Sequence, residues 1–395
     1  MRCKKIIMAI SIIVFALSGC DSKSELQNNE AVSDNDKYKQ EIFADSENLA
    51  EGYRDIYVKA ENAGELDTLE IKQEIIDYFK KEGYAAIDQD NQINMANSEK
   101  IEQFCQKVKD KQEASSVIFS IVAGGDFIRY DMETDNGEIN VIVSNLEWKE
   151  GSPQADYFHQ FQAYTWLYSE NGYFFIEEYH MDGYDGAPGR IGFRVKPLDQ
   201  TCRELNRQYV LPVGYELNKL LITDWHEDDY SNLDFYDLYE RMYYLKYDSS
   251  VPYEDNYGGK EYEVPKADFE EVIKTYFQID SEVIEQNMVY HADTQTYRYR
   301  PRGLYDCELP YGPYPEVIAY EEQVDGTIKL TVNAVWIRKE LDRAITSELV
   351  VRPLENGGFQ YVSNQVIPLT DSIEPEWYQE RLSDEEWIKN YGEGK

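Results

Sequence analysis

One set of landmarks occurs twice along this chain in the same order, and that recurrence constrains the fold more than any other feature. Each set contains an acid-capped helix ending in Tyr-Phe, a hairpin turn, a strand that runs to a tryptophan, a second hairpin turn and an aromatic strand. The first set lies at 67–79, 135–137, 139–148, 170–172 and 173–179, and the second at 268–277, 325–326, 328–336, 355–357 and 359–362. Five landmarks in one order predict a diverged internal duplication.

The turns predict how the strands pair. Asp135-Asn136-Gly137 and Asp325-Gly326 supply residues that tolerate positive φ, which tight hairpins require. Glu-Asn-Gly follows in both sets, at 170–172 and at 355–357. Because consecutive hairpins produce an antiparallel meander, each unit is predicted to be a helical segment followed by such a meander. The predicted fold class is α+β, with two related units.

The division of the chain follows from these landmarks. Residues 38–199 are predicted to form the first α+β unit and residues 265–370 the second. The segment 200–264 between them is acidic and rich in tyrosine, and we expect it to join the two units. Residues 371–395 are predicted to form a helical tail, because Pro375 suits the first position of a helix and apolar residues follow it.

The N-terminus has the pattern of an export signal. Arg2, Lys4 and Lys5 precede a mainly apolar run from Ile6 to Leu17. As a helix this run would measure about 18 Å, which is too short for the roughly 30 Å core of a bilayer. An export signal therefore fits better than a transmembrane anchor.

The sequence Leu17-Ser18-Gly19-Cys20 that closes this segment resembles the lipobox of bacterial lipoprotein signal peptides. The resemblance implies that residues 1–19 are a signal peptide removed by cleavage, and that Cys20 carries a diacylglyceryl thioether and becomes the mature N-terminus. Acyl chains on Cys20 would anchor the protein to the extracytoplasmic face of the cell membrane. Residues 20–37, the lipidated cysteine and a polar, apolar-poor stretch, are predicted to be a flexible tether.

Several shorter segments also resemble known lipoproteins. They are Gly83–Asp88, Asn232–Phe235, Leu330–Trp336, Val350–Leu354 and Tyr361–Asn364. With these segments the chain resembles uncharacterised surface lipoproteins of Gram-positive, gut-dwelling clostridia. The resemblance supplies no activity.

The charge excludes one class of partner. The chain has a net charge of −37, and without residues 1–20 it has 36 Lys and Arg against 76 Asp and Glu, a net charge of −40. Such a surface repels nucleic acid phosphates, so no nucleic acid partner is expected.

Three cysteines remain once Cys3 leaves with the signal and Cys20 is lipidated. Cys105, Cys202 and Cys307 lie far apart and form no CxxC pair. We expect buried free thiols rather than one disulfide, because exported proteins that depend on disulfides usually have more cysteines in an even number.

No common catalytic signature is found in the sequence. GxSxG, SxxK, HExxH, a phosphate loop and GxGxxG are all missing. His159, His180, His226 and His291 are scattered and have no metal-ligand spacing. We therefore nominate no catalytic, cofactor-binding or metal-binding residue, and we predict that the protein is not an enzyme.

Two acidic clusters have some features of cation sites. Asp88 begins a polar stretch with Glu99 at position 12, as in a calcium loop, but Ile93 stands where that loop needs glycine, so a polar turn is favoured. The second cluster runs from Asp224 to Asp237. A solvated loop is favoured there, with calcium binding as the alternative.

A run of tyrosines is the remaining candidate for recognition. It consists of Tyr236, Tyr239, Tyr243, Tyr244, Tyr247, Tyr253, Tyr257 and Tyr262. Tyr236, Tyr239, Tyr243 and Tyr247 fall at helical spacing and are predicted to pack. A platform for a carbohydrate or protein ligand is the alternative, because tyrosine suits wet recognition surfaces.

Taken together, these patterns predict a non-enzymatic binding or interaction module held at the membrane by lipid on Cys20. Two alternatives remain. One is a carboxylate-based enzyme acting on polysaccharide, for which the many acids allow no nomination. The other is a solute-binding lipoprotein, whose repeated strand–helix–strand units are a poor match to strands that cluster after the helices.

Overall fold

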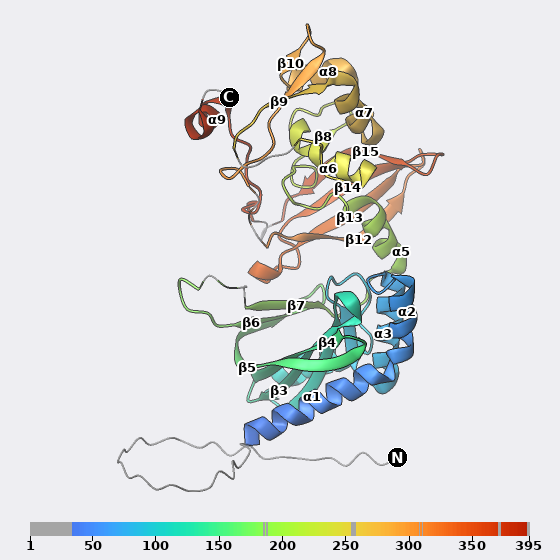
Figure 1. Cartoon of the computed structure of the whole chain (residues 1–395), viewed down its shortest axis with the longest axis vertical. Coiled ribbons are helices and arrows are strands. Elements are labelled where there is room, and N and C mark those ends of the chain that lie inside the picture. The colour runs from blue at the N-terminus through green and yellow to red at the C-terminus, as the bar shows by residue number, and fades with distance from the viewer. Residues whose placement is uncertain are drawn as a thin grey trace. The chain divides into compact units, whose positions relative to one another are not determined.

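The structure is a computed structural model that describes residues 34–184, 186, 189–253, 258–307, 309, 311–369 and 373–392 (Figure 1). Residues 1–33, with the predicted signal peptide, Cys20 and most of the tether, lie outside the described residues. The chain divides into two units after Glu41, within helix α1 (Asp34–Gly52). The description below concerns the second unit. None of the helices in the described ranges has the length and apolar character that a membrane span needs.

The first half of the second unit contains helices α2 (Arg54–Ala63), α3 (Leu69–Glu82) and α4 (Ser98–Lys109). Helix α3 begins where the Thr68 hydroxyl accepts a hydrogen bond from the Ile71 amide, and it ends at Gly83 in the left-handed region. The cap is therefore Thr68 rather than the predicted Asp67, because the hydroxyl reaches the third amide of the helix.

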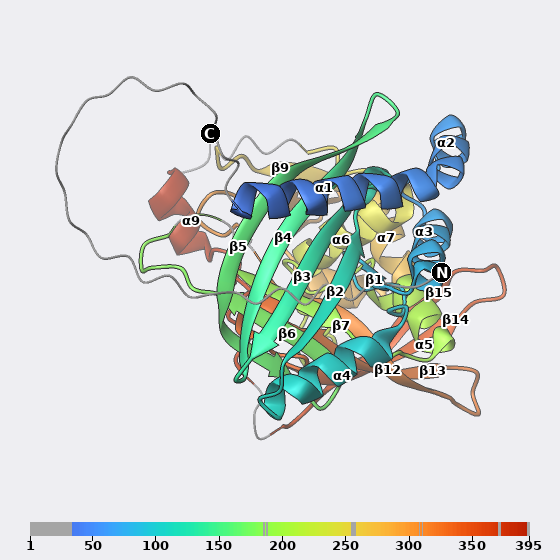
Figure 2. The ribbon, with the colours of Figure 1, turned by 90° about the horizontal axis from the view of Figure 1, so that it is seen from below.

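Seven strands follow one another in a single sheet ordered β1 to β7. They are β1 (Ala85–Asp88), β2 (Ala114–Ile121), β3 (Phe127–Asp135), β4 (Glu138–Lys149), β5 (Ser152–Tyr168), β6 (Tyr173–Glu178) and β7 (Arg190–Arg194). The β1–β2 pair is parallel and the others are antiparallel. The sheet curls into a nearly closed barrel, and Figure 2 shows β2 to β5 side by side with β6 and β7 crossing behind them.

Strand β5 produces this curvature by changing partners along its length. Its residues 152–162 pair with β4, and its residues 163–168 pair with β6. The register shifts once between Asn145 and Leu146 on β4, and again between Ala163 and Thr165 on β5, so Tyr164 is the extra residue of a β-bulge. A bulge bends its strand and increases the local twist. The bend at Tyr164 turns the sheet back on itself.

The second half of the unit contains the remaining helices and two further sheets. The helices are α5 (Gln200–Leu205), α6 (Phe235–Tyr247), α7 (Lys266–Tyr276), α8 (Ser281–Asn287) and α9 (Asp384–Tyr391). The larger sheet has the order β12 (Tyr314–Glu322), β13 (Ile328–Val335), β14 (Thr346–Pro353), β15 (Phe359–Ile367) and β8 (Trp225–His226). The smaller has the order β10 (Tyr290–His291), β11 (Thr296–Tyr299) and β9 (Tyr262–Pro265).

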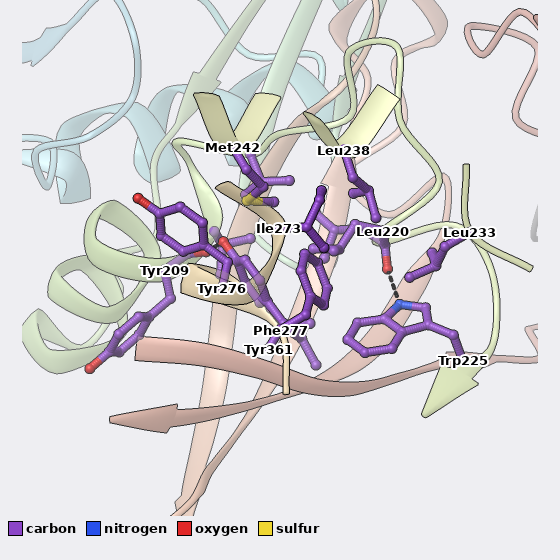
Figure 3. Packing of buried hydrophobic residues seen from close by; sticks show 14 of the residues in the cluster. Tyr209, Leu220, Trp225, Leu233, Leu238, Met242, Ile273, Tyr276, Phe277 and Tyr361 are labelled. Carbon is purple, nitrogen blue, oxygen red and sulfur yellow. Dashed lines mark hydrogen bonds between the residues drawn. The ribbon is translucent and has the colours of Figure 1, made fainter. Parts of the chain in front are cut away.

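The core of this half includes the segment 200–264, which was expected to join two units. Leu220, Trp225 and Met242 from that segment pack against Phe277 and Tyr361 (Figure 3). The Trp225 indole donates a hydrogen bond to the Leu220 carbonyl oxygen at 2.8 Å and meets the Phe277 ring at 5.9 Å. Because the segment supplies α6, β8 and β9 as well as these side chains, it completes the second half.

The mixed α+β fold class is confirmed. The landmark turns join β3 to β4, β5 to β6, β12 to β13 and β14 to β15, as expected. The opening helices differ in their surroundings. The strand after α3 pairs with β2, whereas Phe277 after α7 bridges to Tyr361 of β15. Helix α7 also begins at Lys266, which puts Asp268 inside its first turn instead of at its cap.

Two smaller expectations are corrected. The tail helix α9 begins after Ser383, which forms a capping box with Glu386, so the predicted start at Pro375 is wrong. A reciprocal cap satisfies two backbone amides, which a proline at the first helical position does not. The three cysteines are free thiols, as expected, but only Cys105 and Cys202 are buried and Cys307 is exposed.

Candidate functional site

Three of the acidic residues from 224 to 237 have structural partners. An Asp224 carboxylate oxygen accepts a hydrogen bond from the Val366 amide at 2.7 Å, and Asp234 caps α6. Asp237 is fully buried and pairs with the guanidinium groups of Arg302 and Arg381 at 2.8 and 2.6 Å. Within the described ranges, no three His, Cys, Asp or Glu side chains are grouped so that they could hold a metal ion.

Asp88 also has a structural role. It ends β1, and its carboxylate accepts hydrogen bonds from the amides of Gln92 at 3.0 Å and Ile93 at 2.7 Å. Burial raises the pKa of Asp88 above its usual range, and the two amides oppose that shift. The polar turn predicted here is confirmed.

The tyrosine run divides between core and surface. Tyr239 is buried on α6 and stacks on Phe269 with ring centroids 4.4 Å apart. Tyr236 and Tyr243 pack partly buried against the same core, so the predicted packing role holds for these three. Tyr244 and Tyr247 are exposed on α6. Tyr257 lies outside the described residues.

A groove at the bend of β5 is the strongest candidate for a binding site. It has a volume of about 450 Å³, within the range common for ligand sites. Its lining comes from the β3–β4 turn, from β5 and from the end of β6, and consists of Gly137, Glu138, Ile139, Gln162, Ala163, Tyr164, Trp166 and Tyr179. We call this the bend groove.

The bulge explains why an aromatic ring faces solvent in the bend groove. Tyr164 has no partner residue in the β5–β6 register, and 64% of it is exposed. Bulges redirect side chains in this way. Tyr179, immediately after β6, is 61% exposed, and its ring centroid lies 5.2 Å from that of Tyr164 with the planes tilted by 53°. Trp166 is half-buried and packs edge-to-face on Phe174.

The lining of the bend groove also includes two polar side chains. Gln162 donates a hydrogen bond to the Glu138 carboxylate at 2.8 Å, and both side chains are exposed. The turn that carries Glu138 has φ of 53° at Asn136 and 89° at Gly137, the left-handed geometry that this residue pair adopts easily. The lining contains no lysine, arginine or histidine.

His159 and His180 of the barrel both lie close to the carboxylate of Glu178. His159 on β5 lies with its Nε2 atom 2.7 Å from Glu178 on β6, and the Nε2 atom of His180 lies 3.7 Å from the other oxygen of Glu178. The His180 ring also contacts Tyr184, with centroids 4.0 Å apart. Spacing alone did not reveal this cluster, because it forms through the pairing of β5 with β6.

A buried polar cluster connects the barrel to the second half. Tyr173 of β6 donates a hydrogen bond to Glu316 of β12 at 2.7 Å, and Arg194 of β7 lies 3.3 Å from the same carboxylate. Burial raises the pKa of Glu316 above its usual range, with Arg194 opposing the shift. The adjoining cavity beside Arg203 measures only about 10 Å³, the space of one water molecule. This cluster is therefore a structural link and too small a site for a larger ligand.

Sequence reasoning missed the bend groove. Tyr164 and Trp166 belong to a stretch of β5 with frequent aromatic residues, and that was the available signal. It did not reveal that the β3–β4 turn and Tyr179 lie beside them, because that proximity depends on the change of partners in β5.

Comparison with known proteins yields one match. The model of DUF6070, described as a family of unknown function, matches residues 39–381. No curated protein and no solved structure matches the chain.

Proposed function

Because the chain belongs to DUF6070, a family of unknown function, we propose its role from its own residues: a non-enzymatic binding protein, anchored by lipid on Cys20 to the extracytoplasmic face of the cell membrane. Its ligand, a carbohydrate or a protein, binds in the bend groove. Nucleic acid is not a ligand, because a net charge of −37 repels phosphate.

The bend groove is the observation that carries this proposal. Two strongly exposed tyrosine rings lie 5.2 Å apart beside an exposed amide and carboxylate. Amphipathic rings with a few polar groups nearby are typical of recognition sites. A bulge at Tyr164 directs one ring outward, so the exposure is built into the backbone.

The anchor rests on the lipobox sequence Leu17–Cys20. In a bacterial host that processes lipoproteins, Cys20→Ala should give an unprocessed or released protein, because no thioether can form. Cell fractionation and mass spectrometry of the N-terminal peptide provide the measurement. Membrane retention of a cleaved Cys20→Ala protein would overturn the anchor.

The binding role is tested by sedimentation with insoluble cellulose, starch, chitin and xylan, and with immobilised casein as the protein. The wild type is expected to sediment with at least one of these materials, and the Tyr164→Ala/Tyr179→Ala double variant to lose most of that binding. Tyr244→Ala is the matched control, because Tyr244 is 53% exposed on α6, away from the groove residues. Sedimentation with none of the materials, or equal sedimentation of the double variant, rejects the groove as the binding surface.

We also propose that the two halves derive from one duplicated unit. The strand order β3–β4–β5–β6 recurs as β12–β13–β14–β15, with a glycine turn at the first and last connection of each set. Trp148 lies at the end of β4 and Trp336 immediately after β13. In this proposal the helices and β1 were added or repositioned after duplication.

A further inference from the structure

The lining of the bend groove restricts the chemistry of its ligand. The rings of Tyr164 and Tyr179 offer apolar faces at a wet surface, and Gln162 and Glu138 offer an amide and a carboxylate within the same groove. A ligand that matches needs flat C–H surfaces for the rings and hydroxyl groups for the polar side chains. A pyranose ring has both.

Charge argues against an anionic ligand. The groove lining has no cationic side chain and includes Glu138, while the whole chain has a net charge of −37. An anionic glycan would meet repulsion without a compensating partner. The chemistry therefore favours a neutral ligand.

The β4 edge beside the groove offers little backbone to an extended peptide. A peptide strand binds by adding to a sheet edge, and it needs a row of unpaired amides and carbonyls. On the β5 side of β4, pairing begins at Asn140, so within β4 only Glu138 and Ile139 precede it on that edge. Two residues are fewer than the shortest common strand. On β5, residues 163–168 pair with β6 alone, and the bulge at Tyr164 interrupts the regular strand geometry of that edge.

We propose that the bend groove binds a neutral oligosaccharide. One sugar ring packs against both Tyr164 and Tyr179, and sugar hydroxyls exchange hydrogen bonds with Gln162 and Glu138. This inference rests on the proposed binding function and names the class of its ligand.

Isothermal titration calorimetry of the detergent-solubilised lipidated protein tests the ligand class. The probes are five neutral hexasaccharides, derived from cellulose, starch, xylan, mannan and chitin, together with hexagalacturonate as the anionic counterpart and casein peptides. Binding of at least one neutral hexasaccharide is expected, with no binding of hexagalacturonate.

Four variants assign the binding to the groove. Tyr164→Ala and Tyr179→Ala should each raise Kd about tenfold, the equivalent of one lost stacking contact. Tyr164→Phe keeps the ring and should bind nearly as wild type. Tyr244→Ala is the surface control and should leave Kd unchanged. Equal melting temperatures establish that each variant is folded.

The outcomes distinguish failure of the oligosaccharide proposal from failure of the proposed binding function. If no neutral hexasaccharide binds the folded wild type, the oligosaccharide proposal is overturned, and the sedimentation experiment still decides the binding function. Groove-dependent binding of casein peptides or hexagalacturonate also overturns the ligand class and leaves the binding function in place. If Tyr164→Ala and Tyr179→Ala both bind as tightly as wild type, the groove proposal and the ligand class fail together.

Discussion

The four strands β3–β6 and the four strands β12–β15 have the same order and matching turns, yet they form different sheets. In the second set, residues 346–351 of β14 pair with β13 on one side and β15 on the other. In the first set, no residue of β5 pairs with both β4 and β6. These residues of β14 therefore pair with both neighbouring strands, whereas β5 pairs with β4 along one part of its length and with β6 along the other.

The difference shows how strand length selects the architecture. β5 has 17 residues and β14 has eight. A long strand with a bulge can leave one partner and reach another, which curls the sheet toward closure. A short strand keeps its partners and leaves the sheet open. The open sheet needs a cover, which α6, α7 and the tail segment with Trp377 supply through the core of the second half.

The largest effect is expected at the buried ion pairs of Asp237, in the second half with its open sheet. Asp237→Ala leaves Arg302 and Arg381 buried without their carboxylate, which should lower the free energy of unfolding by about 3–5 kcal/mol. Hydrogen exchange should increase first in α6 and residues 300–306. Asp228→Ala is the control, because Asp228 is an exposed acid of the same segment. A decrease in the free energy of unfolding of less than ~1 kcal/mol for Asp237→Ala would show that these ion pairs do not stabilise the packing of α6 and the tail segment on the open sheet.

A second variant tests whether the two halves unfold together. Tyr173→Phe removes the phenol that donates to the buried Glu316 carboxylate, and it should cost about 1–3 kcal/mol. Urea unfolding gives the cost, and hydrogen exchange locates it. Because the bond joins β6 to β12, peptides of both halves should lose protection equally. Loss confined to β6 would mean that the halves are independent.

The two landmark turns provide a matched pair. Gly137 and Gly326 have φ of 89° and 83°, so alanine at either position is strained by about 1–2 kcal/mol. A Cβ at Gly137 would lie 3.4 Å from the Val108 carbonyl oxygen and from Lys111 Cγ, at the close limit of ordinary contact, whereas a Cβ at Gly326 would have no neighbouring atom within 4 Å. Gly137→Ala should therefore cost more than Gly326→Ala in urea unfolding. A larger cost for Gly326→Ala than for Gly137→Ala would contradict the closer packing around Gly137.

The last comparison is a contrast in pH dependence. Burial raises the pKa of Asp126 to about 6, with the Trp148 amide opposing the shift. A raised pKa means that the folded state retains the proton longer, so this carboxyl contributes less stability as pH rises from about 4 to 6. Hydrogen bonds from Thr327 lower the pKa of Asp325, and its contribution is lost as pH falls instead.

Asp126→Asn and Asp325→Asn should therefore change the pH profile of unfolding in opposite directions. Relative to wild type, Asp126→Asn should gain stability between pH 4 and 6, and Asp325→Asn should lose stability as pH rises through the acidic range. Urea unfolding at a series of pH values and constant ionic strength measures both. Differences of the same sign would refute the contrast.

The parts of the fold that local residues determine were predictable. The turns at Asn136-Gly137 and Asp325-Gly326 follow from backbone preference. Helix α4 follows from the spacing of Ile101, Cys105 and Val108. The curl of the barrel was not predictable, because it depends on a change of partners at residues 162 and 163 of β5.

The candidate site was missed for the same physical reason. Tyr164 and Tyr179 become neighbours only when β5 leaves β4, and no local pattern records that event. The role of Asp237 was equally hidden, because its partners Arg302 and Arg381 lie far along the chain. Within residues 224–237, sequence reasoning recognised the acids but not their cations.

The position of Arg381 in the sequence bears on the order in which the two halves can fold during synthesis. Arg381 lies 144 residues after Asp237 in the sequence and pairs with Asp237 and Glu240 on α6. A chain made from its N-terminus exposes every strand of the barrel before β12 is synthesised, so the barrel can close early. The second half must wait until residue 381 has been made before the Arg381 guanidinium can pair with those two carboxylates. Until then Glu240 lacks its arginine, whereas Asp237 can already pair with Arg302, so the second half completes its ion pairs after all strands of the barrel have been made.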